Sequence, residues 1–181
     1  MSFPLPCLSR KTLVNSLAEA LAVEQAMEKT LGGQLRESCN AEASRLYGEH
    51  AEISAAQQAR LGQHLEQMGE IVEPSRGGFM ASLSAVGPTG IRCADPLERE
   101  AQNLRASYVR AQLECAMYRA LQAQASSLRD DATWRLAREH LAQEEAYVRR
   151  LWPYVGLLTE LAATTSRTRR YPEAAAGLAY G

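Results

Sequence analysis

The sequence of 181 residues has few cysteines, and they lie far apart. Cys7, Cys39, Cys93 and Cys115 contain no pair spaced as CxxC. This spacing argues against a zinc site of the usual kind and against a disulfide framework. We expect reduced thiols, with Cys115 filling space in the core.

The chain also lacks long apolar runs and an excess of one charge. No run of about 18 apolar residues occurs, and residues 1–13 have no basic segment followed by an apolar one, so neither a transmembrane helix nor a signal peptide is predicted. The 20 Lys and Arg residues nearly balance 21 Asp and Glu residues, for a net charge of −1. A nearly neutral chain has no general attraction to nucleic acid or membrane. We therefore expect a cytoplasmic protein with neither partner.

No stretch shows β alternation, and no short repeat of solenoid period is visible. Helical periodicity dominates instead, and a length of 181 residues with 46% hydrophobic content favours one domain. We predict an all-α protein with an extended arm over residues 1–8, a helical bundle over 9–163 and a basic flexible tail over 164–181.

The central stretch from Asp95 to Trp152 predicts two long amphipathic helices joined by a polar turn. Glu114 lies within the apolar stripe of the first helix, and Glu144 lies between Leu141 and Val148 in the stripe of the second. Both carboxylates should point inward. Burial of a carboxylate is costly unless it is paired, protonated or bound to a cation, so metal ligation is one candidate explanation.

The N-terminal half predicts a similar pair. A helix begins at Ser9 or Thr12, carries Glu24 in its apolar stripe, and ends or loosens at Gly32-Gly33. A second helix within residues 39–72 has an unusually polar stripe that includes His50, Gln57 and His64. Glu24 is therefore a third inward carboxylate.

Proline and glycine residues between 74 and 90 interrupt the helical pattern and leave room for one short helix within residues 79–86. Near the C-terminus, Pro153 should stop the fourth helix or start a short terminal helix over residues 154–163. Two antiparallel hairpins joined by one long crossover describe the ferritin-like four-helix bundle, in which inward acidic residues hold two metal ions.

Four runs carry a resemblance to a known family. LECAMYRALQAQASSL at 113–128 and LAQEEAYVRRL at 141–151 resemble the last helix pair of the stress-induced ferritin-like proteins of the bacterial YciE/YciF type. LAVEQAMEKTL at 21–31 and EHAEISAAQQARL at 49–61 are similar to the first pair. The resemblance implies a four-helix bundle, often dimeric, with a rubrerythrin-like dinuclear iron centre.

Carried over by position, the resemblance places Glu24, Glu114 and Glu144 at acidic family positions. Glu52 is included because the neighbouring acidic position is Ile53 here, and His140 because it stands one turn before Glu144. The chain departs from the family's ligand pattern at the positions Ile53, Ala111, Gln112 and Tyr147, and a position that is frequently His or Gln in the family is Gln57 here. Each departure removes a carboxylate or imidazole that suits iron.

Two functional hypotheses follow. In the first, the protein is stress-associated and keeps a depleted carboxylate site for iron, or for manganese, that performs redox chemistry with oxygen or peroxide as a di-iron oxidoreductase. In the second, the bundle has no metal and acts as a structural or protein-binding module, with the inward glutamates paired to arginines. A homodimer through helix faces is expected in either case. His50 and His64 are interpreted as surface or core-edge residues, and Tyr118 and Tyr147 as hydrogen-bonding core aromatics.

Overall fold

The structure, a computed structural model, describes residues 9–70 and 95–170, and of residues 167–170 the backbone only. Within these ranges it contains the helices α1 (Arg10–Glu37), α2 (Ala41–Gln67), α4 (Pro96–Leu128) and α5 (Asp131–Arg170), and no strand. The prediction of an all-α fold is confirmed. The short helix expected within residues 79–86 lies outside the described residues.

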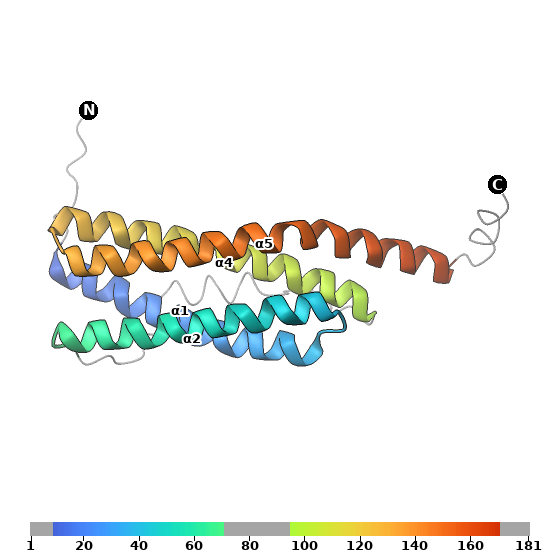
Figure 1. Ribbon diagram of the computed structural model, residues 1–181, viewed down its shortest axis with the longest axis horizontal. Helices are drawn as coiled ribbons and strands as arrows, with labels where there is room; N and C mark the ends of the chain where they lie inside the picture. Colours follow the sequence, from blue (N-terminus) through green and yellow to red (C-terminus); the bar gives the residue numbers. More distant parts are fainter. Residues whose placement is uncertain (1–8, 71–94, 171–181) are drawn as a thin grey trace, which may run out of the picture.

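The helices form two antiparallel hairpins, α1 with α2 and α4 with α5 (Figure 1). In addition α1 contacts α4, and α2 contacts α5, so that the two hairpins pack into one bundle. Figure 1 shows that α2 and α4 run in the same direction, so α2 ends at the end of the bundle opposite to the one where α4 begins. This order of directions confirms the ferritin-like topology with one long crossover.

Side chains at the helix ends explain where the turns lie. The Asn40 side chain accepts hydrogen bonds from two backbone N–H groups at the start of α2, and Asp95 does the same at the start of α4. Proline follows Asp95 at the first helical position, which suits its fixed backbone angle. Arg129 ends α4 in the left-handed conformation, with φ of 56°.

Two predicted helix ends are wrong. α1 continues through Gly32-Gly33 to Glu37, because two glycines cost only about 1 kcal/mol each in a helix and the buried Leu31 and Gln34 offset that cost. α5 likewise continues through Pro153 to Arg170. Residues 164–170, predicted as part of a flexible tail, are therefore helical.

The continuity of α5 has a physical reason. A proline inside a helix costs about 3 kcal/mol, since it removes one backbone hydrogen bond and crowds the preceding turn. Pro153 is exposed, whereas Leu151, Leu158 and Ala162 around it are buried on one face of the helix. Burial of two leucine side chains contributes about 3–6 kcal/mol, which exceeds the cost of the proline.

The core has two apolar parts. One contains Leu13, Leu17, Leu61, Leu65, Tyr118 and Leu121, and the other contains Met27, Leu31, Leu46, Tyr47, Leu104 and Leu151. Fully buried polar side chains also occur on all four helices, among them Glu24, His50, Glu114 and Glu144. The bundle therefore buries carboxylates as well as apolar groups.

The turn between α1 and α2 is attached to α4 by a buried carboxylate. Glu100 accepts hydrogen bonds from the Tyr47 hydroxyl at 2.9 Å, the Ser38 hydroxyl at 2.7 Å and the Cys39 backbone N–H at 2.8 Å. Tyr47 is fully buried, so its hydroxyl has no access to water in place of Glu100. Glu100 is thus a structural residue with a complete set of donors.

We expect Glu100→Ala to lower the free energy of unfolding by about 3 kcal/mol, because it leaves a buried hydroxyl without an acceptor and releases the turn. Urea denaturation followed by circular dichroism measures this. The matched control is Glu66→Ala at an exposed helical position, which should change stability by no more than about 0.5 kcal/mol. Equal effects of the two substitutions would contradict a structural role for Glu100.

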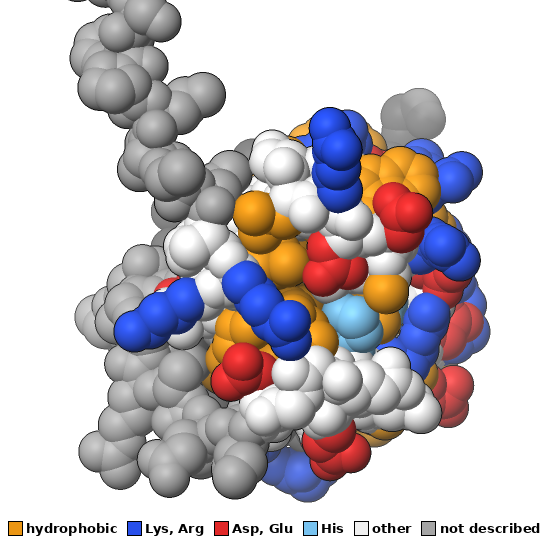
Figure 2. Space-filling view, turned by 90° about the vertical axis from the view of Figure 1, so that its left-hand side faces the viewer, with side chains coloured by type: hydrophobic (Ala, Val, Ile, Leu, Met, Phe, Trp, Pro, Cys, Tyr) orange, Lys and Arg blue, Asp and Glu red, His pale blue; other side chains and the backbone are white. Residues whose placement is uncertain are grey.

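No helix in residues 9–70 and 95–170 is long and apolar enough to cross a membrane. Figure 2 views the end of the bundle where α1 begins and where α4 turns into α5. Basic and acidic side chains are interspersed on this face. This mixture agrees with the small net charge of the chain.

Candidate metal centre

Three carboxylates from three helices point into the bundle. Glu24 of α1, Glu114 of α4 and Glu144 of α5 are fully buried, as the periodicity predicted. Each lies on the apolar stripe of its helix, so the helical period turns it toward the core. Buried in the same region is His50 of α2.

Three of these side chains form a compact group. The His50 Nε2 atom lies 3.0 Å from Glu144 Oε2 and 3.6 Å from Glu114 Oε2. Candidate ligand atoms of His50, Glu114 and Glu144 all lie within 4.8 Å of one another. We call these three residues the ligand triad.

Glu24 belongs to a different set of contacts. One of its carboxylate oxygens accepts a hydrogen bond from the Ser54 hydroxyl at 2.5 Å, and the other accepts one from the Tyr118 hydroxyl at 2.5 Å. Gln57 joins this set to the ligand triad, since its side-chain oxygen lies 3.2 Å from the Tyr118 hydroxyl and its amide nitrogen donates to Glu144 Oε1 at 2.9 Å. We call Glu24, Ser54, Gln57 and Tyr118 the Glu24 network.

The buried carboxylates perturb one another. Burial, followed by repulsion from Glu24 and Glu144, raises the pKa of Glu114 well above its usual range. Burial and repulsion from Glu144 raise the pKa of Glu24 to about 8, although its two hydroxyl donors oppose the shift. Burial and the nearby Glu24 also raise the pKa of Tyr118, which keeps its hydroxyl protonated as a donor.

Several buried polar atoms of the centre have no hydrogen-bond partner. They are both carboxylate oxygens of Glu114, the Nδ1 atom of His50, both ring nitrogens of His140 and the Tyr147 hydroxyl. An unpartnered buried carboxylate costs a large amount of free energy, so Glu114 in particular requires a further ligand or a proton.

The ligand triad fits a divalent transition-metal ion. Imidazole and carboxylate are the donor types that iron and manganese take in proteins, and the two free oxygens of Glu114 face the other two donors. An ion there would satisfy Glu114 and offset the repulsion between Glu114 and Glu144. The donor chemistry and the orphaned oxygens therefore agree.

His50 is the functional residue that the sequence interpretation missed. It was taken as a surface or core-edge histidine, yet it is fully buried and its ring stacks on Tyr147 with centroids 3.8 Å apart. Its position on the polar stripe of α2, one helical turn before Ser54 and two before Gln57, was the available signal. The periodicity could not rank it above His64, which bonds to Thr133 elsewhere on α2.

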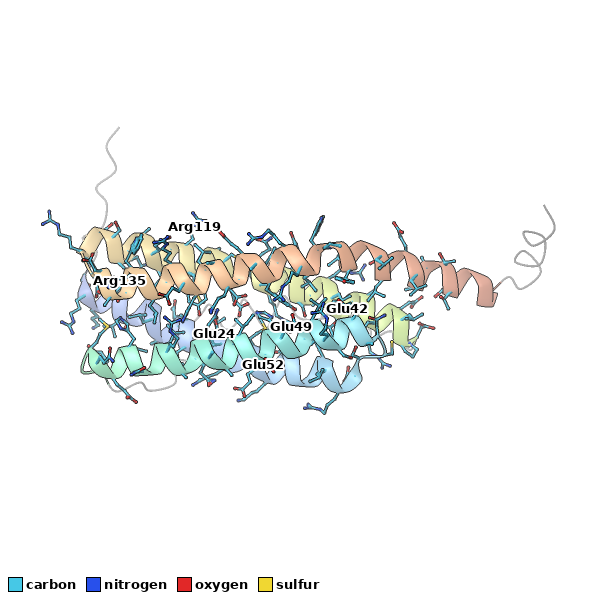
Figure 3. The ribbon with its side chains drawn as sticks, in the orientation of Figure 1. Glu24, Glu42, Glu49, Glu52, Arg119 and Arg135 are labelled. Carbon is cyan, nitrogen blue, oxygen red and sulfur yellow. The ribbon has the colours of Figure 1, made fainter. Side chains whose placement is uncertain are left out.

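The structure separates two predicted site residues from the ligand triad. The inclusion of Glu52 is corrected, because its side chain is exposed on the outer side of α2, as Figure 3 shows, whereas Glu24 lies between the helices. His140 is buried, and its ring meets the edge of Tyr118 at 5.1 Å, but it is not part of the triad. Burial lowers the pKa of His140 to about 3, so its ring is neutral.

The arginine ion pairs among the described side chains do not support the arginine alternative. Buried Arg110, one turn before Glu114 on α4, is attracted to the charge of Glu114, but the Glu114 oxygens accept no hydrogen bond. Their arginine ion pairs join exposed or half-buried carboxylates, such as Glu49 with Arg150 and Glu145 with Arg119. Figure 3 shows Arg119 on the outer side of the bundle. Within residues 9–70 and 95–166, none of the ion pairs of Glu24, Glu114 or Glu144 involves an arginine. The prediction that both tyrosines are hydrogen-bonding core aromatics holds for Tyr118, which donates to Glu24, and is wrong for Tyr147, whose buried hydroxyl has no hydrogen-bond partner among the described residues.

Comparison with protein families gives one match, the family described as "Domain of unknown function (DUF892)", over residues 9–164. The chain belongs to this family. No curated protein matches it. The match to DUF892 covers all of α1, α2 and α4 and most of α5.

Solved structures share the fold. YcfI of Rhodopseudomonas palustris is 22% identical with a TM-score of 0.72, and the match covers 83% of this chain and 97% of that one. The Escherichia coli stress protein YciF is 19% identical with a TM-score of 0.72, covering 83% and 96%. A protein of Xanthomonas campestris is 21% identical with a TM-score of 0.70, covering 88% and 97%. The predicted resemblance to the YciF type is thus confirmed, and the likeness establishes the fold that this DUF892 chain adopts.

Proposed function

We propose that this protein binds iron, or manganese in its place, at the ligand triad and takes part in a stress response through redox chemistry with oxygen or peroxide. The single observation that carries the metal binding is Glu114, a fully buried carboxylate with two unpartnered oxygens that faces His50 and Glu144. The association with stress is carried from YciF, which has the same fold.

The residues of the centre have separate tasks in this proposal. His50, Glu114 and Glu144 hold the ion, and bound iron would supply one-electron chemistry between its ferrous and ferric states. Gln57 fixes the orientation of Glu144 through the hydrogen bond to Oε1. Tyr147 stacks on His50 and fixes the plane of its ring. The apolar side chains on both sides exclude bulk water, which strengthens the attraction between the ion and its ligands.

The metal-free binding module remains the second candidate. It is favoured by Glu24 and Glu144, whose carboxylate oxygens have protein donors without any ion. Glu114 has no such donors, and this difference favours metal binding. The expected homodimer stays a prediction, which light scattering of the purified protein would check.

The test is a titration of metal-free protein with ferrous iron under anaerobic conditions and with Mn²⁺. We expect saturable binding that survives desalting and is lost in the double variant Glu114→Ala with Glu144→Ala, because one histidine alone cannot retain the ion. The control variant is Glu145→Ala, the adjacent residue on the flank of α5, which should bind as the wild type does. Wild-type protein without saturable binding would refute the metal function and favour the binding module.

A further inference from the structure

The buried polar centre is divided between two kinds of contact. The ligand triad has carboxylate oxygens without partners, whereas the Glu24 network has hydrogen bonds at each carboxylate oxygen. A carboxylate oxygen that binds a metal ion can also accept a hydrogen bond, so the number of ions depends on how many strong ligands surround each position. The division therefore bears on how many ions the centre holds.

Short hydrogen bonds fix the position of the Glu24 carboxylate. Its two oxygens each lie 2.5 Å from a hydroxyl, one of Ser54 and one of Tyr118, and all three side chains are fully buried. The Ser54 hydroxyl also lies 3.2 Å from the backbone carbonyl of Glu24, which fixes that helix crossing. These two donors fix the orientation of the Glu24 carboxylate and use one acceptor site on each of its oxygens.

Only one oxygen of Glu144 is hydrogen-bonded to another member of the triad. Its Oε1 atom accepts the amide of Gln57 at 2.9 Å, while its Oε2 atom faces His50 at 3.0 Å. A carboxylate that bridges two ions uses both oxygens, and here one oxygen is already bonded to an amide. Glu144 is thus placed to bind one ion through Oε2.

The side chains around Glu24 do not replace the missing ligands of a second ion. α2 presents Ser54 and Gln57 on this face, and α4 presents Tyr118. A neutral hydroxyl and an amide are weak donors for iron compared with carboxylate and imidazole. His140 packs against Tyr118 with both ring nitrogens unpartnered, but it does not belong to the group of three candidate ligands, His50, Glu114 and Glu144, found among the described residues.

Given the metal binding proposed above, we infer that the centre holds a single metal ion per chain, bound by His50, Glu114 and Glu144, and that the Glu24 network occupies the place of a second ion. The dinuclear centre implied by the family resemblance is therefore reduced to a mononuclear one in this chain. Glu24 acts as a positioning residue that braces Tyr118 and Ser54 beside the ion.

The experiment measures stoichiometry and the magnetic coupling of the bound ions. Metal-free protein is titrated with Mn²⁺ by calorimetry, and the loaded protein is examined by electron paramagnetic resonance. We expect one Mn²⁺ per chain and the resolved hyperfine lines of an isolated ion. Two ions per chain with an exchange-coupled spectrum would overturn the mononuclear inference and leave the metal function standing. Absence of any bound Mn²⁺ or iron would refute both.

Two variants locate the ion. Glu24→Gln keeps a polar side chain between Ser54 and Tyr118, and we expect it to retain one Mn²⁺ with an affinity within about tenfold of the wild type, a change of about 1.4 kcal/mol. Glu114→Gln should bind none. Ser54→Ala, which leaves Glu24 unchanged, should also retain one ion and serves if Glu24→Gln fails to fold. A loss of metal in Glu24→Gln comparable to that in Glu114→Gln would show that Glu24 is a ligand and overturn the inference.

Discussion

Glu114→Gln should make the metal-free protein more stable, by a few kcal/mol, and abolish its response to metal. Burial without a donor and repulsion from Glu24 and Glu144 raise the pKa of Glu114, so folding near neutral pH requires this carboxyl to keep a proton that the unfolded chain has released. An amide of the same shape is neutral in both states and removes this penalty. Thermal melts at neutral pH measure the effect, which for a chain of this size corresponds to an increase of about 5–10 °C in Tm.

Metal addition separates the variant from the wild type. A hundredfold excess of Mn²⁺ over its dissociation constant should stabilise the wild type by about 2.7 kcal/mol and leave Glu114→Gln unchanged. The control is Glu145→Gln, which alters a half-exposed ion pair with Arg119 and should change stability by less than about 1 kcal/mol. A destabilised Glu114→Gln variant would contradict the unpaired state of this carboxylate, since removal of one partner from a buried ion pair costs about 3–5 kcal/mol.

The metal-free protein should lose stability as the pH rises from about 5.5 to 8.5. The pKa of Glu24 is raised from 4.5 to about 8 by burial and by Glu144, and the pKa of Glu114 is raised well above 4.5. At a pH between the unfolded and the folded pKa of such a carboxyl, the folded state keeps a proton that the unfolded state has released. Each such carboxyl therefore lowers the free energy of unfolding by about 1.4 kcal/mol per pH unit. Below pH 4.5 this loss of unfolding free energy is absent. For Glu24 it reaches its full value above about pH 8.

Urea denaturation at a series of pH values measures this slope. Glu24→Gln and Glu114→Gln should each reduce it, and the double variant should keep only the opposite trend below about pH 6.5, where His140, whose pKa is lowered to about 3, makes stability rise with pH. Bound metal should also flatten or reverse the wild-type slope, because the ion requires deprotonated ligands. A metal-free wild type with constant stability from pH 5.5 to 8.5 would mean that the carboxyl groups carry the same charge in the folded and unfolded states.

The sequence by itself determined the fold class and the inward carboxylates. Apolar residues with a 3.6-residue period define a stripe, and Glu24, Glu114 and Glu144 lie within their stripes, so their burial follows from helix geometry alone. The turn chemistry at Asn40 and Asp95 likewise follows from short-range preferences. The helix ends at Gly32-Gly33 and Pro153 were mispredicted, since the local cost of these residues is smaller than the packing of their neighbours.

Only the tertiary structure decided which polar residues meet. His50, Ser54 and Gln57 share the polar stripe of α2, and their spacing does not reveal which of them faces Glu144 and which faces Glu24. Glu52 and His140 were predicted as ligands for the same reason, since each lies near the polar or apolar stripe of its helix. Such a position does not determine which side chain of another helix it contacts, and in the structure Glu52 is exposed and His140 is buried outside the triad. The rotation of α2 about its axis sets these contacts, and that rotation depends on packing against α1 and α5. The ligand triad and the Glu24 network are therefore properties of the packed bundle, while the supply of carboxylates to its core is a property of the sequence.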